Sequence, residues 1–179
     1  MLIAAVLVLL APLAVILLLA AFKPATFRVE RRTTVQASAG TVFASLEDFH
    51  RWVHWSPWEG LDPALQRTYS GPAVGQGAVY AWEGNKKVGA GRMEIVESTP
   101  PSRLGVKLDF LRPWEAHNTV EFSLTPAAGG TTDVVWAMSG PQPFSARIFS
   151  VVMPMEKLVG RDFEKGLSSL KRISEAGHA

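Results

Sequence analysis

The feature that most constrains this chain is a long apolar segment at its N-terminus. Every residue from Leu2 to Phe22 is apolar or proline, over about 21 positions. A helix of that length rises about 30 Å, which matches the thickness of the hydrocarbon core of a bilayer. Pro12 removes only one backbone hydrogen bond, which membrane helices tolerate. The sequence therefore predicts a transmembrane anchor over residues 1–23 and a single-pass location in the cell membrane.

The residues around this segment bear on its processing and orientation. A cleaved signal peptide normally starts with a basic region and has a shorter apolar core, whereas nothing basic precedes Leu2, so we expect an uncleaved anchor. The first basic residues after the segment are Lys23, Arg28, Arg31 and Arg32. By the positive-inside rule they favour a cytoplasmic domain. The three arginines also fit the solvated face of a first strand, so the side of the membrane stays open.

The remaining chain has the composition of one ordinary domain. Cysteine is absent, which excludes disulfides, thiolate metal sites and thiol nucleophiles. The 18 basic and 16 acidic side chains are mostly interleaved and give a net charge of +2, so no basic patch indicates a nucleic-acid partner. We expect one domain over residues 24–173 and a short frayed tail over residues 174–179.

Alternating apolar and polar residues predict a run of antiparallel strands. The expected strands cover residues 26–35, 67–70, 78–83, 88–97, 103–110, 114–125 and 131–139. Glycine-containing turns at residues 84–87 and 126–130 join two neighbouring pairs. After the first strand, apolar residues at helical spacing predict a short helix or helix pair over residues 41–53, preceded by a cap at Ser38.

A long amphipathic helix is expected at the C-terminus. Its apolar stripe extends through Phe163, Leu167 and Leu170 to residue 173. Pro154 interrupts the pattern, so residues 144–153 should form a separate short helix or a kinked lead-in. The order of strand, short helices, about six strands and long helix predicts an α+β helix-grip fold, in which a curved antiparallel sheet surrounds one helix and leaves a cavity.

Five segments in this order are similar to those of one known superfamily. They read DFHRWVHWSPW, TYSGP, YAWEGN, VGAGRMEI and GRDFEKGLSSLK. They resemble SRPBCC proteins, the START-like and polyketide cyclase/dehydrase-related helix-grip domains, and the similarity covers nearly everything after the apolar segment. The resemblance implies six or seven strands around the C-terminal helix and two short helices after the first strand. The resemblance is specific for the fold and not for a function, because the superfamily includes lipid carriers, cyclases and proteins without a known ligand. No catalytic motif carries over.

Aromatic side chains are the best candidates for a functional role. The chain has six Trp and nine Phe but only two Tyr, and such rings need a core or a ligand to cover them. The indoles of segment 50–58 could pack the short helices against the long one, or could wall a cavity with other side chains. The candidate cavity residues are Trp52, Trp55, Trp58, Tyr80, Trp82, Met93, Trp114, His117, Trp136 and Met155.

The polar residues predict no metal site, cofactor or catalytic residue. His50 and His54 have the spacing of two zinc ligands, but no third ligand and no intervening glutamate accompany them. His117 and Glu83 could move a proton in a cavity, although a polar outer strand face explains His117 as well.

Three functions remain open at this point. The first is a membrane-anchored module that binds a hydrophobic or amphipathic small molecule, lipid or polyketide-like. The second is a cyclase or dehydrase-type enzyme that acts in the same cavity, and the third is a ligand-free interaction protein. The sequence names neither the ligand nor the oligomeric state.

Overall fold

The computed structural model describes residues 2–177, with side chains from Ala11 onward. Its elements in chain order are α1 (Leu2–Phe22), β1 (Thr26–Val35), α2 (Ala39–Leu46), η1 (Phe49–His54), β2 (Gln66–Ser70), β3 (Val79–Glu83), β4 (Ala90–Thr99), β5 (Arg103–Arg112), β6 (Ala116–Pro126), η2 (Ala128–Gly130), β7 (Thr132–Pro141), α3 (Phe144–Val152) and α4 (Met155–Ala176).

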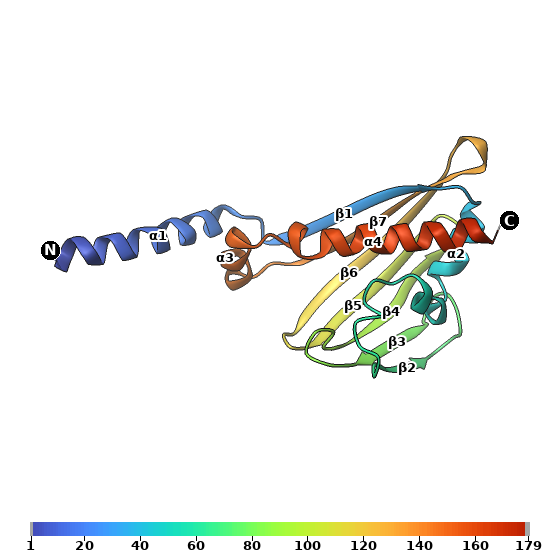
Figure 1. Ribbon diagram of the computed structural model, residues 1–179, viewed down its shortest axis with the longest axis horizontal. Coiled ribbons are helices and arrows are strands. Elements are labelled where there is room, and N and C mark those ends of the chain that lie inside the picture. Colours follow the sequence, from blue (N-terminus) through green and yellow to red (C-terminus); the bar gives the residue numbers. More distant parts are fainter. Residues whose placement is uncertain (1, 178–179) are drawn as a thin grey trace.

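All strands belong to one antiparallel sheet of seven strands in the order β1-β7-β6-β5-β4-β3-β2. Consecutive strands are neighbours from β2 to β7, as in a series of hairpins, and β1 forms one edge of the sheet by pairing with β7. The sheet curves, and α4 lies across it beside β1 (Figure 1). This arrangement confirms the predicted α+β helix-grip architecture.

The long helix α4 is held close to the sheet. Phe163, Leu167 and Leu170 are buried on its inner face, as the apolar stripe predicted. Gly166 lets the helix approach closely, because a Cβ there would lie only 2.7 Å from the Trp136 ring. Next to Gly160 of α4, Arg31 of β1 pairs with Glu156 and with Glu164, the latter at 2.7 Å.

The short helices pack against each other through two indole hydrogen bonds. Ser38 caps α2, since its side chain accepts a hydrogen bond from the Thr41 backbone N–H. Trp52 and Trp55 in and after η1 donate through Nε1 to the carbonyl oxygens of Leu46 and Ser45, at 2.9 and 3.2 Å. These bonds satisfy two buried indole N–H groups and fix η1 on the end of α2.

Several boundaries differ from the predicted ones. The expected strand from residue 114 begins only at Ala116, because the ladder between β5 and β6 ends at the pair Phe110 and Ala116 and residues 113–115 form the connection. The break at Pro154 is confirmed, and that residue precedes α4. At the other end α4 runs to Ala176 rather than Ile173, because Ser174 is still buried against the fold. Residues 178–179 of the expected tail lie outside the described residues.

The predicted membrane anchor needs a correction. The segment forms helix α1 over Leu2–Phe22, so the predicted helix itself is confirmed. Among the residues that the structure describes, no helix is long and apolar enough to cross a membrane. This finding contradicts the predicted single-pass location in the cell membrane, and the expected membrane partner and cytoplasmic orientation lose their basis.

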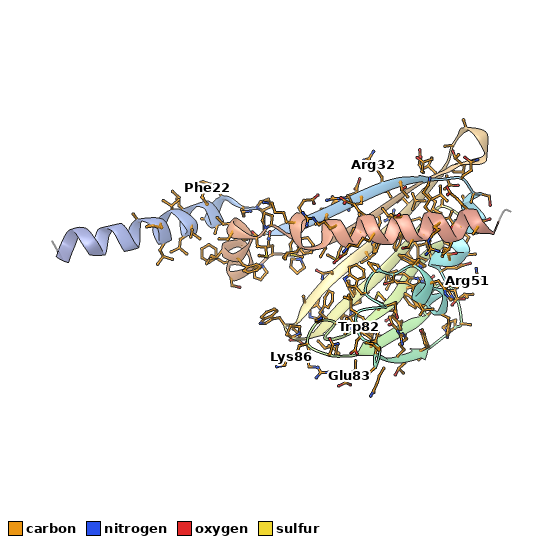
Figure 2. The ribbon with its side chains drawn as sticks, viewed as in Figure 1. Phe22, Arg32, Arg51, Trp82, Glu83 and Lys86 are labelled. Atoms are coloured by element: carbon orange, nitrogen blue, oxygen red, sulfur yellow. The ribbon has the colours of Figure 1, made fainter. Side chains whose placement is uncertain are left out.

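Helix α1 extends away from the sheet and meets the domain at α3 (Figure 1). Lys23, just after α1, donates through Nζ to the Ser150 carbonyl at 2.9 Å. Arg147 of α3 donates in return to the Lys23 carbonyl at 3.3 Å. Phe22 at the end of α1 is 83% exposed (Figure 2). The two helices therefore meet at the end of the sheet where β1 begins and β7 ends.

Candidate functional site

A cavity of about 660 Å³ lies between the inner face of the sheet, η1 with its following loop, and helices α3 and α4. Ligand pockets for small organic molecules typically enclose about 300–1,000 Å³. The wall is formed mainly by aromatic and aliphatic side chains from six strands, with Met155, Val159 and Phe163 contributed by α4. The cavity therefore has the size and lining of a site for an apolar small molecule.

The strand pattern explains why these side chains point inward. Tyr80 and Trp82 alternate with exposed or half-buried residues along β3. Leu108 and Phe110 lie on the inner face of β5, and Asp109 between them lies on the other face. Trp82 lies over β4 at Gly91, where any Cβ would collide with the indole. Its Nε1 donates to the Val88 carbonyl at 3.1 Å, which fixes the ring at the lower end of the sheet (Figure 2).

Aromatic contacts hold the opposite wall. The Trp136 ring stacks on Phe163 of α4 with centroids 4.1 Å apart and an angle of 6° between the planes. Trp58 meets the same indole edge-on at 5.8 Å, and Trp52 meets Trp55 at 4.7 Å. Such edge-to-face and offset contacts are the preferred geometries of aromatic pairs. The rings are held by their neighbours and form a rigid wall.

Nine of the ten cavity candidates predicted from the sequence lie around this cavity. They are Trp52, Trp58, Tyr80, Trp82, Met93, Trp114, His117, Trp136 and Met155. Trp55 does not line the cavity, because its indole is packed in the core. Trp55 is 2% exposed, and its ring lies edge-on to Phe122 and Trp136. Ligand binding by the other nine stays a prediction.

Two of the nine, Trp114 and His117, lie at the rim of the cavity, and their rings point away from its interior. Trp114 is 82% exposed in the loop between β5 and β6. The His117 ring pairs through Nδ1 with Asp109 Oδ1 at 2.7 Å, and alternation places both residues on the outer face of the sheet. Burial alone would raise the pKa of Asp109, but hydrogen bonds from His117 and Lys107 outweigh it and lower that pKa below its usual range.

A buried polar group in the wall was not foreseen from the sequence. Glu59, with a side chain only 8% exposed, accepts a hydrogen bond from the Tyr80 hydroxyl at 2.7 Å and another from Arg67 Nε at 2.7 Å. Burial, together with the bond to Glu59, raises the pKa of Tyr80 far above its usual value, so the phenol stays neutral. No spacing rule could reveal this group, because its members come from a loop, β2 and β3.

The other polar candidates lie away from the cavity interior. Glu83 is exposed at the end of β3 and pairs with Arg112 at 2.7 Å (Figure 2). His50 Nδ1 lies 3.1 Å from Asp48 Oδ1, and its ring stacks on Tyr69. Within the described part of the chain, no group of three His, Cys, Asp or Glu side chains could hold a metal ion.

Comparison with known proteins agrees with this geometry. Residues 26–175 match the family model described as polyketide cyclase/dehydrase and lipid transport. No curated protein sequence matches the chain.

Solved structures with the same fold are distant in sequence. Protein CV1439 from Chromobacterium violaceum is 14% identical, with a TM-score of 0.58 over 86% of this chain and 99% of that one. The Aha1 dimer from Colwellia psychrerythraea is 18% identical, with a TM-score of 0.56 over 86% and 99% of the two chains. Protein SA2116 from Staphylococcus aureus, of unknown function, is 11% identical, with a TM-score of 0.64 over 86% and 96%. At these identities the similarity shows the fold alone.

Proposed function

Because the chain belongs to the polyketide cyclase/dehydrase and lipid transport family, we propose that it binds a hydrophobic or amphipathic small molecule, lipid or polyketide-like, in the cavity beneath α4. The single observation that carries this proposal is the cavity itself, about 660 Å³ and lined mainly by apolar side chains. Apolar surface removed from water is the main source of affinity in such a site.

Six of the nine lining candidates have defined parts in this proposal. Trp52, Trp58, Trp82 and Trp136 present flat apolar surfaces, and their contacts with neighbouring rings hold them in place without a ligand. Because these side chains are already ordered, ligand binding costs little of their conformational entropy. Met93 and Met155 add flexible thioether side chains, which adapt to irregular ligand shapes.

A titration of delipidated protein with the neutral fluorescent probe phenylnaphthylamine tests the proposal. We expect saturable binding to the wild type. Val159→Trp, which inserts an indole into the cavity from α4, should weaken binding by at least about tenfold, because the added ring occupies ligand volume. Lys157→Trp, at an exposed position of the same helix, is the matched control and should bind as the wild type does.

Either of two results would count against a ligand site in this cavity. The first is that the wild type shows no saturable binding. The second is that both tryptophan variants bind the probe equally well. Near-ultraviolet circular dichroism of both variants checks that the domain still folds.

The enzyme alternative receives no support from the geometry of its two proposed proton carriers. Glu83 is exposed in an ion pair with Arg112, and the His117 ring pairs with Asp109 on the outer face. A general base has to come within hydrogen-bond reach of the substrate atom that it deprotonates. Neither group is oriented toward the cavity interior.

One observation favours the third alternative, a ligand-free interaction protein. Trp114, Phe149 and Met153 are 82%, 57% and 43% exposed at the rim of the cavity. Exposed apolar clusters often mark contact sites for other molecules. The probe titration separates this alternative from ligand binding, because a partner surface does not require an accessible cavity.

A further inference from the structure

We propose that the side-chain amides of Asn118 and Gln142 form the polar end of the cavity and select ligands whose head group is uncharged and both donates and accepts hydrogen bonds. A hydroxyl group or a primary carboxamide has this chemistry. The inference rests on the proposed ligand-binding function and adds to it the chemical class of the head group.

The register of the sheet brings the two amides together. Thr119 of β6 pairs with Ser139 of β7, so Asn118 lies opposite Gly140. Gln142 follows two residues later on the same face of the chain, which makes it the diagonal neighbour of Asn118, a distance that long side chains can bridge. Both residues line the cavity, next to Met138 and the start of α3.

Glycine at position 140 makes room for the Asn118 amide. A Cβ at this position would collide with Asn118 Oδ1. The backbone around Gln142 is also fixed, because its N–H donates to the Ala25 carbonyl at 2.6 Å. The backbone therefore fixes where both side chains begin at the end of the sheet.

Asn118 and Gln142 are more than nine-tenths buried as whole residues, but their side-chain amides have no partner among the described residues. Asn118 and Gln142 are each 8% exposed. Neither side chain makes a hydrogen bond with another group among residues 11–177, whereas the hydroxyls of Thr132 and Ser150, also buried, each donate to a backbone carbonyl. Buried polar groups are almost always hydrogen-bonded in folded proteins. A ligand that enters the cavity can supply the missing partners.

The donors and acceptors of a carboxamide define the head group. Each amide offers an NH₂ group with two donors and a carbonyl oxygen with two lone pairs. A hydroxyl group between them can accept from one NH₂ and donate to the other carbonyl. A carboxylate only accepts, and the two neutral amides offer no charge to offset its desolvation. Glu59, elsewhere in the wall, already accepts from Tyr80 and Arg67.

A series of ligands with one chain length and different head groups tests this inference. Decanol, decanamide, decanoate and chlorodecane would compete with phenylnaphthylamine for the wild type, for Asn118→Leu and for Gln142→Met, both close to isosteric. Each substitution should weaken decanol and decanamide by about 3- to 10-fold, the effect of one lost hydrogen bond. Chlorodecane, which has no donor, should bind each variant as tightly as the wild type or more tightly.

A second measurement needs no ligand. Replacing an amide that has no protein partner by an apolar side chain of similar shape removes no hydrogen bond within the protein and leaves less polar surface to desolvate, so neither variant should unfold at a lower temperature than the wild type. Gln66→Met, at an exposed position of β2, is the control and should leave both the affinities and the unfolding temperature unchanged.

The outcomes distinguish this inference from the function on which it rests. If the wild type binds the probe and the four ligands, but the substitutions shift all four affinities equally or not at all, the amides do not select the head group. If neither the probe nor any ligand binds, the proposed function fails and the inference fails with it. Lower unfolding temperatures of both variants would show that the amides already have partners in the protein, which also overturns the inference. If Asn118→Leu does not fold, the affinities of Gln142→Met for the four ligands are compared with those of the wild type in the same way.

Discussion

Replacing Gly166 by alanine should destabilise the domain, although alanine is the better helix former. The added Cβ would lie 2.7 Å from the Trp136 ring and 3.1 Å from Pro57 Cδ. Carbon atoms in optimal contact are about 3.5–4.0 Å apart, so α4 or the indole has to move by nearly 1 Å. The indole is stacked on Phe163 at 4.1 Å and contacts Trp58 and Phe122 as well, so it has little freedom to move.

The magnitude follows from two opposing terms. Overpacking a well-filled core costs about 1–3 kcal/mol, and the rigid surroundings of Trp136 place this site near the upper end. Alanine regains about 1 kcal/mol of helix propensity over glycine. The net loss is therefore about 1–2 kcal/mol, which lowers the unfolding temperature by roughly 2–8 °C in a domain of this size.

Gly40→Ala is the matched control within the same chain. Gly40 also lies in a helix, but a Cβ there would meet only Ser38 Oγ at 3.9 Å. This substitution should therefore stabilise the domain by up to about 1 kcal/mol. Urea unfolding of both variants, followed by tryptophan fluorescence, gives the two free energies with their signs. If Gly166→Ala is as stable as the wild type, α4 is not pressed against Trp136 and the cavity wall is less rigid than we argue.

Three further predictions concern the polar groups and the rim. Tyr80→Phe should lower the free energy of unfolding by about 1–3 kcal/mol in urea titrations, because it leaves the buried Glu59 carboxylate without one of its two donors. Since the folded-state pKa of Asp109 is lowered, its contribution to stability is complete above the ordinary aspartate pKa of about 3.9 and is lost as the pH falls through the folded pKa. The stability difference between wild type and Asp109→Asn should therefore shrink on acidification, and a constant difference would contradict this. Trp114→Ala should change the free energy of unfolding by less than about 0.5 kcal/mol, because its indole is 82% exposed; a larger loss would mean that the ring packs on the domain.

Much of the fold could be predicted from local patterns. A strand repeats every two residues and a helix every 3.6, so alternation located the strands and the stripe through Phe163 located α4. Pro154 marked the break before α4, because proline cannot donate the backbone hydrogen bond that a helix interior requires. These signals act over a few residues and do not depend on what the element packs against.

The apolar N-terminal segment shows the limit of such patterns. Its composition predicted helix correctly, and α1 is helical. The location in a membrane was a further step, and no helix among the described residues supports it.

The candidate site could be predicted only in part. Aromatic residues in alternating strands had to face the interior, which is why Tyr80, Trp82 and Trp136 lie around the cavity. The spacing of Trp52 and Trp55 could not separate their roles, because a 3-10 helix has three residues per turn and places both indoles on one side.

The sequence alone determined where strands and helices form and which side chains face inward. The reason is that side chains at regular spacing along a strand or helix lie on the same face of that element. Only the tertiary structure decided which inward groups meet. Glu59 contacts Tyr80 and Arg67 because its loop folds over β2 and β3. Asn118 lies opposite Gly140 because of the register between β6 and β7. Such pairs depend on contacts between segments that are distant in the sequence. The chemistry of the cavity could therefore be deduced only from the tertiary structure.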